Sequence, residues 1–193
     1  PGLCGFVTTT NITVIALPLI TVTADTTQGC APTTIHFNAT TNQPGGTYYW
    51  NFGSLNATTH DTSHLQNPTF TYEYAGSFNV YFSYTNVWGC KNDTSLPNYI
   101  IIHSQPHANF TASPQPTDIF SPTITFTDLT VGTVNNWYWD FYDYGSSTVQ
   151  NPSVTYADTG HYNVQLAVTN NFGCTDTISK YVNIDPTYTC YIP

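Results

Sequence analysis

The sequence has very few charged residues. They make up 7% of its 193 residues, the only basic ones are Lys91 and Lys180, and the formal net charge is −9 at pH 7. A chain without arginine and with two lysines cannot neutralise a row of phosphates, which argues against nucleic acid as a partner and against a basic membrane-surface patch. The surface must instead be covered by uncharged side chains such as Thr, Asn, Ser, Gln and Tyr.

Long hydrophobic runs are also missing. The longest apolar stretch, residues 12–22, is too short to span a bilayer and is interrupted by Pro18. The residues at Pro1 do not show the charged n-region and cleavage pattern of a signal peptide. No window shows the apolar periodicity of a helix between capping residues. We therefore expect a mature, soluble piece with no membrane span and an all-β fold.

What the sequence does contain is an internal repeat of 24 residues. Residues 67–90 and 151–174 align without gaps and are identical at 11 positions. In the second half of each copy apolar residues alternate with polar or small ones, which is the pattern of a strand with one buried face. A Tyr-x-x-x-Gly run precedes that strand and supplies a turn. Each copy predicts a strand, a tight corner, a long strand and a turn.

The repeat predicts two domains. Short stretches rich in aromatic and β-branched residues, bounded by Gly, Pro and Asn, precede each copy and complete about seven strands per unit. We expect two tandem immunoglobulin-like β-sandwiches arranged end to end. The expected boundaries are residues 1–16 for the last strand of a preceding repeat, 17–103 for domain 1, 104–185 for domain 2, and 186–193 for the start of a following domain or a linker.

Several motifs of the second domain follow one another in a characteristic order. They are Trp139-Asp140-Phe141, an Asn-Pro about ten residues later, Tyr-x-x-x-Gly-x-Tyr-x-Val and Thr-Asn-x-x-Gly-Cys. Together they resemble the PKD (polycystic kidney disease) domain family, in the Gly-Cys-Ala-Pro variety of Bacteroidota surface proteins, and the resemblance extends over nearly the whole chain. The tail, residues 186–193, is similar to the opening of the gliding-motility-associated C-terminal domain, a type IX secretion signal.

The resemblance implies a function without chemistry. It implies a non-catalytic structural or adhesive repeat of an extracellular surface protein or filament, acting as a rigid spacer or a self-associating stalk. The alternative is an accessory glycan- or substrate-binding module of a secreted hydrolase. The partners implied are neighbouring repeats of the same protein, further copies in a filament, or glycans. No cofactor is implied, and the expected location is secreted, extracellular or at the cell surface.

Cysteine spacing favours disulfides over metal binding, because no zinc-finger or Cys-x-x-Cys pattern is present. The candidates are Cys30, Cys174, Cys90, Cys4 and Cys190. In an alternating sandwich the first and last turns lie at opposite ends, about 20 Å apart, whereas bridged Cα atoms lie within about 7 Å. Stacking the two domains end to end would bring the first turn of domain 1, which carries Cys30, against the last turn of domain 2, which carries Cys174. We therefore favour Cys30 to Cys174, with Cys30 to Cys90 as the alternative. Cys90 then requires a first-turn cysteine from a preceding repeat or a neighbouring chain.

Other candidate sites have simpler structural explanations. His60, Asp61 and His64 share one loop without a fourth metal ligand, so we expect a solvated loop. Asp140 and Asp143 fall short of the oxygens that Ca²⁺ requires, and we expect Asp140 to accept hydrogen bonds from turn amides. No nucleophile motif or recurring carboxylate pair is present, so we expect no catalytic, metal or cofactor site.

Aromatic residues and sequons complete the set of candidates. We expect Trp50 and Trp139 in the two cores, where a sandwich holds its tryptophan. Trp88 and Phe172 precede Gly-Cys at a turn, where we favour packing between domains over sugar stacking. Five Asn-x-Thr sequons are glycosylation candidates that fit a secreted glycoprotein: Asn11, Asn38, Asn56, Asn92 and Asn109.

Overall fold

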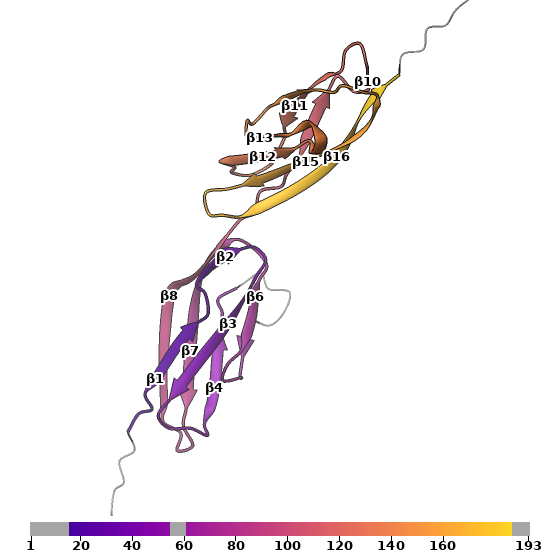
Figure 1. The fold of residues 1–193 in the computed structure, drawn as a ribbon. Coiled ribbons are helices and arrows are strands. Elements are labelled where there is room, and N and C mark those ends of the chain that lie inside the picture. The colour runs from indigo at the N-terminus through magenta and orange to yellow at the C-terminus, as the bar shows by residue number, and fades with distance from the viewer. Residues whose placement is uncertain (1–15, 55–60, 187–193) are drawn as a thin grey trace, which may run out of the picture. The chain divides into compact units, whose positions relative to one another are not determined.

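The computed structural model describes residues 16–54 and 61–186 (Figure 1). Regular structure in these two ranges is β-strand, apart from the short 3-10 turn η1 (Tyr142–Tyr144). The strands form four sheets that make two β-sandwiches. The prediction of an all-β, immunoglobulin-like fold is confirmed. Within the described ranges no helix is long and apolar enough to cross a membrane.

The first sandwich consists of a three-stranded and a five-stranded sheet. The smaller sheet has the order β1 (Ile20–Ala24), β3 (Thr33–Thr41), β6 (Thr69–Tyr72). The larger has the order β2 (Gln28–Cys30), β8 (Lys91–His103), β7 (Gly76–Thr85), β4 (Thr47–Asn51), β5 (Thr62–Ser63). Strand β3 shows why the chain adopts this form: Ile35, Phe37 and Ala39 are buried while the residues between them are exposed. That alternation places one face of the sheet on the core.

The second sandwich repeats this plan. Its smaller sheet has the order β14 (Ser153–Thr155), β11 (Thr123–Asp128), β9 (Phe110–Ser113). Its larger sheet has the order β10 (Thr117–Asp118), β16 (Thr175–Asp185), β15 (Gly160–Thr169), β12 (Asn136–Asp140), β13 (Ser146–Ser147). The long β15–β16 hairpin is antiparallel, and β10 adds to β16 in parallel.

The chain divides into two compact units that do not follow the strand pairing completely. Of the described residues, the first contains 16–27, 34–54, 61–73 and 77–101, and the second contains 28–33, 74–76 and 102–186. Strand β2 is hydrogen-bonded in the sheet of β8 yet belongs to the second unit. The domain boundaries at residues 17–103 and 104–185 remain a prediction.

Each core is built around one tryptophan that is fully buried, Trp50 on β4 and Trp139 on β12. The Trp50 ring lies 4.5 Å from Phe82, and its Nε1 donates to the Leu65 carbonyl oxygen at 2.9 Å. The Trp139 ring meets Phe110 edge to face at 5.1 Å. Its Nε1 has no hydrogen-bond partner among the residues described. The two cores share their packing but differ in this one polar contact.

Replacing Trp50 or Trp139 with Ala should destabilise the corresponding sandwich by about 3 to 5 kcal/mol, because a large aromatic site in a packed core is emptied. Hydrogen exchange read by mass spectrometry on peptides from each sandwich measures the loss locally. Trp88→Ala is the matched control, since Trp88 is 62% exposed and should change stability by less than about 0.5 kcal/mol. Equal losses at Trp88 and Trp50 would contradict the core assignment.

Candidate functional site

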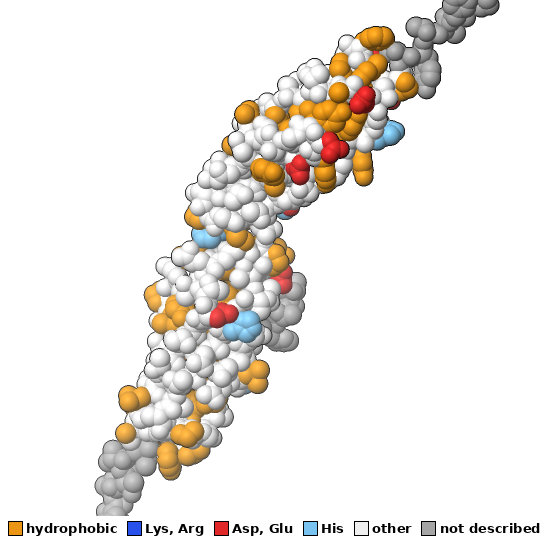
Figure 2. All heavy atoms as spheres, viewed as in Figure 1, with side chains coloured by type: hydrophobic (Ala, Val, Ile, Leu, Met, Phe, Trp, Pro, Cys, Tyr) orange, Lys and Arg blue, Asp and Glu red, His pale blue; other side chains and the backbone are white. Residues whose placement is uncertain are grey.

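The surface carries few charges. On the face drawn in Figure 2, acidic and histidine side chains are few and lie among hydrophobic and uncharged polar surface. Considering only the two described ranges, no group of three or more His, Cys, Asp or Glu side chains lies close enough to hold a metal ion.

The residues considered as metal ligands take part in local structure. His64 Nδ1 lies 2.9 Å from the Tyr48 carbonyl oxygen, and its ring packs on Tyr49 at 5.5 Å. Asp61 is half-buried, and His60 lies outside the described residues. Asp140 Oδ1 accepts the Tyr142 N–H at 2.8 Å, which confirms the expected bond to a turn amide.

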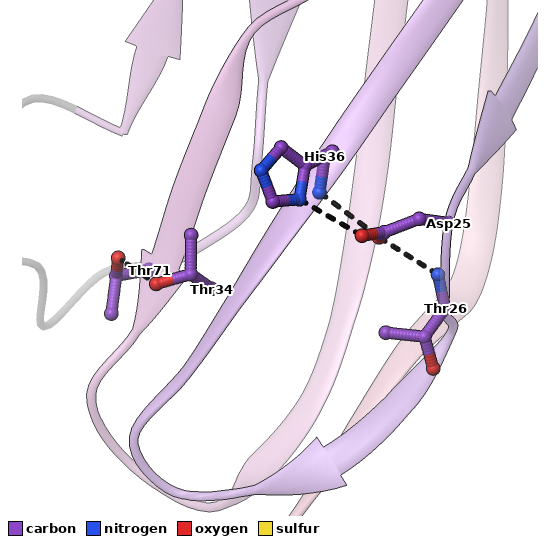
Figure 3. Close-up of polar contacts among 5 residues, drawn as sticks. All are labelled: Asp25, Thr26, Thr34, His36 and Thr71. Carbon is purple, nitrogen blue, oxygen red and sulfur yellow. Dashed lines mark hydrogen bonds and ion pairs between the residues drawn. The ribbon is translucent and has the colours of Figure 1, made fainter.

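An Asp–His pair that sequence reasoning missed lies on the smaller sheet of the first sandwich (Figure 3). His36 Nδ1 on β3 lies 2.9 Å from Asp25 Oδ2, beyond the end of β1. Asp25 Oδ1 accepts the backbone N–H groups of His36 at 3.0 Å and Thr26 at 2.8 Å. The only signal in the sequence is a His at an exposed position of a strand, because its partner is supplied by strand register.

The Asp–His pair has the first two members of a hydrolase triad but lacks a hydroxyl directed by the imidazole. The Thr34 and Thr71 hydroxyls beside it bond to each other at 2.8 Å (Figure 3). Asp25 and His36 are both exposed, whereas an aspartate that orients a catalytic imidazole is buried. The arrangement is that of a surface ion pair, which connects β3 to the residue that follows β1.

Hydrogen bonding lowers the pKa of the Asp25 carboxyl below its ordinary value of 3.8. The largest cause is the His36 backbone N–H; the His36 imidazole and the Thr26 N–H add to it and outweigh the opposing effect of desolvation. A carboxylate that accepts such bonds is stabilised in its charged form.

The long-range disulfide joins Cys30 of β2 to Cys174, just before β16, with a Cα–Cα distance of 5.6 Å. Cys174 is 1% exposed. The loop that carries Cys30 belongs to the same compact unit as Cys174, and the Ala31 N–H donates to the His103 carbonyl oxygen at 2.9 Å. The His103 ring stacks on Phe172 at 3.8 Å. This is the pairing favoured from topology, and the alternative with Cys90 is not formed.

The remaining cysteines and the sequons are placed as follows. Cys90 is a half-buried free thiol, and Cys4 and Cys190 lie outside the described residues. Asn38 and Asn109 are exposed, whereas Asn92 is half-buried and its Nδ2 donates to the Pro18 carbonyl oxygen at 2.8 Å. Asn11 and Asn56, and residues 187–193 of the tail that resembles a secretion signal, are outside the part of the chain that is described.

Comparison with known proteins finds a similarity over the second sandwich. A family model described as PKD domain matches residues 103–184. No curated protein matches the chain. The match supports the resemblance over these residues.

Solved structures with a similar fold include single domains and a larger fragment. The PKD1 domain of Vibrio anguillarum Epp is 24% identical, covers 43% of this chain and 96% of its own, and has a TM-score of 0.38. The PKD1 domain from Vibrio cholerae metalloprotease PrtV is 25% identical, with 42% and 98% covered and a TM-score of 0.37. A C-terminal 282-residue fragment of intimin, in complex with the intimin-binding domain of its translocated receptor, is 14% identical, with 86% and 64% covered and a TM-score of 0.53. The intimin fragment shows the shared fold alone.

The His36 side chain should contribute to the depressed pKa of Asp25. In His36→Gln the carboxyl pKa should rise but stay below 3.8, because the backbone N–H at this position is retained. A depressed folded-state pKa stabilises the fold above the unfolded-state pKa, and this contribution disappears as the pH falls through the folded value. Carboxyl ¹³C NMR titration measures the shift, with His64→Gln as the control. An Asp25 that titrates at or above its ordinary value would contradict the bonding described.

The disulfide can be mapped directly. Digestion by pepsin without reduction should release a peptide pair that contains Cys30 and Cys174, because the chain has too few basic residues for trypsin. Iodoacetamide added to the unreduced protein should label Cys90. Recovery of Cys30 joined to Cys90 would contradict the pairing.

Proposed function

We propose that this chain is a non-catalytic structural or adhesive repeat of an extracellular surface protein or filament, which acts as a rigid spacer or self-associating stalk. We assign residues 17–103 and 104–185 to two PKD-like domains, residues 1–16 to the last strand of a preceding repeat, and 186–193 to the start of a following segment. The observation that carries the proposal is the disulfide between residues that are 144 apart in sequence.

The position of this bond along the chain is suited to tension. A force applied through the residues before Cys30 and after Cys174 passes through the sulfur atoms and bypasses the chain between them. Trp50 and Trp139 both lie between the two cysteines in sequence, so the bond keeps them out of the stretched path. Persistent disulfides are typical of oxidising compartments outside the cell, which supports an extracellular location.

Single-molecule stretching between tethers at the two ends tests this role. With the disulfide intact, only the segments outside the cross-link, including β1 and β16, should extend. Reduction should release the 144-residue loop, which adds roughly 500 Å of contour length at about 3.3 to 3.6 Å per residue. Cys90→Ser is the matched control and should give the same pair of traces. Extension of the whole chain while the disulfide is intact would contradict the rigid-spacer role.

A second candidate function is glycan binding as an accessory module of a secreted hydrolase. Tyr138 on β12 and Tyr181 on β16 are 50% and 73% exposed. They pair with Ala167 and Asn163 of the intervening β15, which lie on one face of that strand because they are four residues apart. Two tyrosines on one sheet face offer flat surfaces to a sugar ring. Polysaccharide pull-down with Tyr138→Ala and Tyr181→Ala variants distinguishes this function from a passive spacer.

A further inference from the structure

Two turns of this molecule are built in the same way, Asn86–Cys90 in the first sandwich and Asn170–Cys174 in the second. In each, the Asn Oδ1 accepts the N–H of the aromatic residue two positions on and of the cysteine four positions on, at 2.8 to 3.0 Å. In each, the Asn N–H donates to the cysteine carbonyl oxygen at 3.0 Å. Gly89 and Gly173 both adopt a positive φ, of 84° and 82°. The two turns therefore hold an aromatic residue and a cysteine in the same local backbone arrangement.

Other residues of the chain already bind the second turn. Its cysteine, Cys174, is bonded to Cys30 and excluded from solvent. Its aromatic residue, Phe172, is covered on one side by the His103 ring, at an interplanar angle of 8°. The first turn differs in its bonding, since Cys90 is a free thiol and no described ring stacks on Trp88. The two aromatic side chains are similarly exposed, Trp88 to 62% and Phe172 to 58%.

The occupant of the second turn has a recognisable composition. It combines a Gly-Cys-Ala-Pro loop, residues 29–32, with the strand end at His103, to which Ala31 is hydrogen-bonded. The hydrogen bond therefore holds the cysteine, Cys30, close to the stacking ring, His103. An occupant of the first turn must provide the same pair of groups.

The chain as described cannot provide this pair from its own sandwiches. Its single Gly-Cys-Ala-Pro loop is already bonded to Cys174. The corresponding segment of the second sandwich, residues 114–122 between β9 and β11, contains no cysteine. The other cysteines, Cys4 and Cys190, are not in a Gly-Cys-Ala-Pro sequence, and a second copy of the chain has the same set. A different sandwich of this type, whose first loop still has a free cysteine, would provide both groups.

We propose that the Asn86–Cys90 turn is a docking site for the cysteine loop and adjoining strand end of a further PKD-like sandwich, located earlier in the polypeptide, with Cys90 forming a disulfide to that loop. The order follows the bond already present, in which the loop precedes the turn along the chain. The inference rests on the proposed function and extends it, because it makes the cross-link a repeating joint.

The bond forms by oxidation of two thiols. They lose two electrons and two protons, which a disulfide oxidant such as glutathione disulfide takes up as it becomes two glutathione thiols. Cys90 thiolate attacks the mixed disulfide on the loop cysteine, and glutathione thiolate leaves. No group on the protein other than the two cysteines is consumed.

Two full-length variants of the chain test the proposal. The acceptor carries Cys4→Ser and Cys190→Ser, so that Cys90 is its only free thiol. The donor carries Cys4→Ser, Cys90→Ser, Cys174→Ser and Cys190→Ser, so that Cys30 is free beside His103. A second donor adds Phe172→Ala to release His103 from its own turn, and near-UV circular dichroism verifies that both donors are folded. The variants are mixed in a glutathione redox buffer, and covalent species are quantified at equilibrium by non-reducing electrophoresis and mass spectrometry.

With the second donor, the Cys30–Cys90 heterodimer should be about tenfold more abundant than its statistical share, which is the proportion expected if the free thiols pair at random. A tenfold excess corresponds to the free energy that one aromatic contact contributes. Trp88→Ala in the acceptor should abolish the excess, whereas Phe120→Ala, which removes an exposed ring elsewhere, should leave it unchanged. A heterodimer at its statistical share, or a predominance of Cys90–Cys90 dimers, would overturn the proposal. Neither result affects the stretching experiment, because its outcome does not depend on Cys90. The two proposals can therefore fail separately.

Discussion

Each sandwich is held together by packing of aromatic rings around one buried indole. In the first, Trp50 contacts Phe82 from the adjacent strand and Phe37 from the opposite sheet, at 4.5 and 5.6 Å between ring centroids. In the second, Trp139 occupies the same place between Phe110 and Phe126. An aromatic side chain buries about 150 to 250 Å², worth roughly 4 to 6 kcal/mol at about 25 cal/mol per Å². These contacts connect the two sheets of each sandwich, and the strands around them depend on that connection.

Ion pairs contribute little to the stability of the described structure. Among the described residues the one ion pair is His36 with Asp25, and it is exposed. Cross-strand hydroxyl pairs lie on the smaller sheets instead: Thr34 with Thr71, Thr123 with Thr155, and Thr125 with Ser153. Salt screens ion pairs between exposed side chains, whereas it does not screen neutral pairs of this kind.

The two Asn-centred turns connect the fold to the proposed role. A buried Asn side chain fixes each turn by accepting two backbone N–H groups, so the cysteine is held at the end of a hairpin rather than on a loose loop. The same construction appears once with its cysteine bonded and once with its cysteine free. In the proposed role these turns are equivalent attachment points, and the distribution of cysteines along the chain determines which of them are used.

Much of this molecule follows from its sequence alone. The period-two alternation predicts the long strands β7 and β15, because a strand with one buried face requires it. The repeat predicts that Trp50 and Trp139 have equivalent positions, and the combined motifs indicate the family that residues 103–184 match. The turn bond of Asp140 was also predictable, since a short acidic side chain commonly accepts amides two residues on.

Other features were decided only by the tertiary structure. The Asp25–His36 pair depends on the register of β1 against β3, and the Tyr138–Tyr181 face depends on the register of β12 and β16 against β15. The polar contact of each core tryptophan also differs, because Leu65 offers a carbonyl oxygen to Trp50 and no described residue offers one to Trp139. Local pattern specifies which face of a strand is buried. Register and loop path specify which polar groups meet, and they are set by the packing of the whole sandwich.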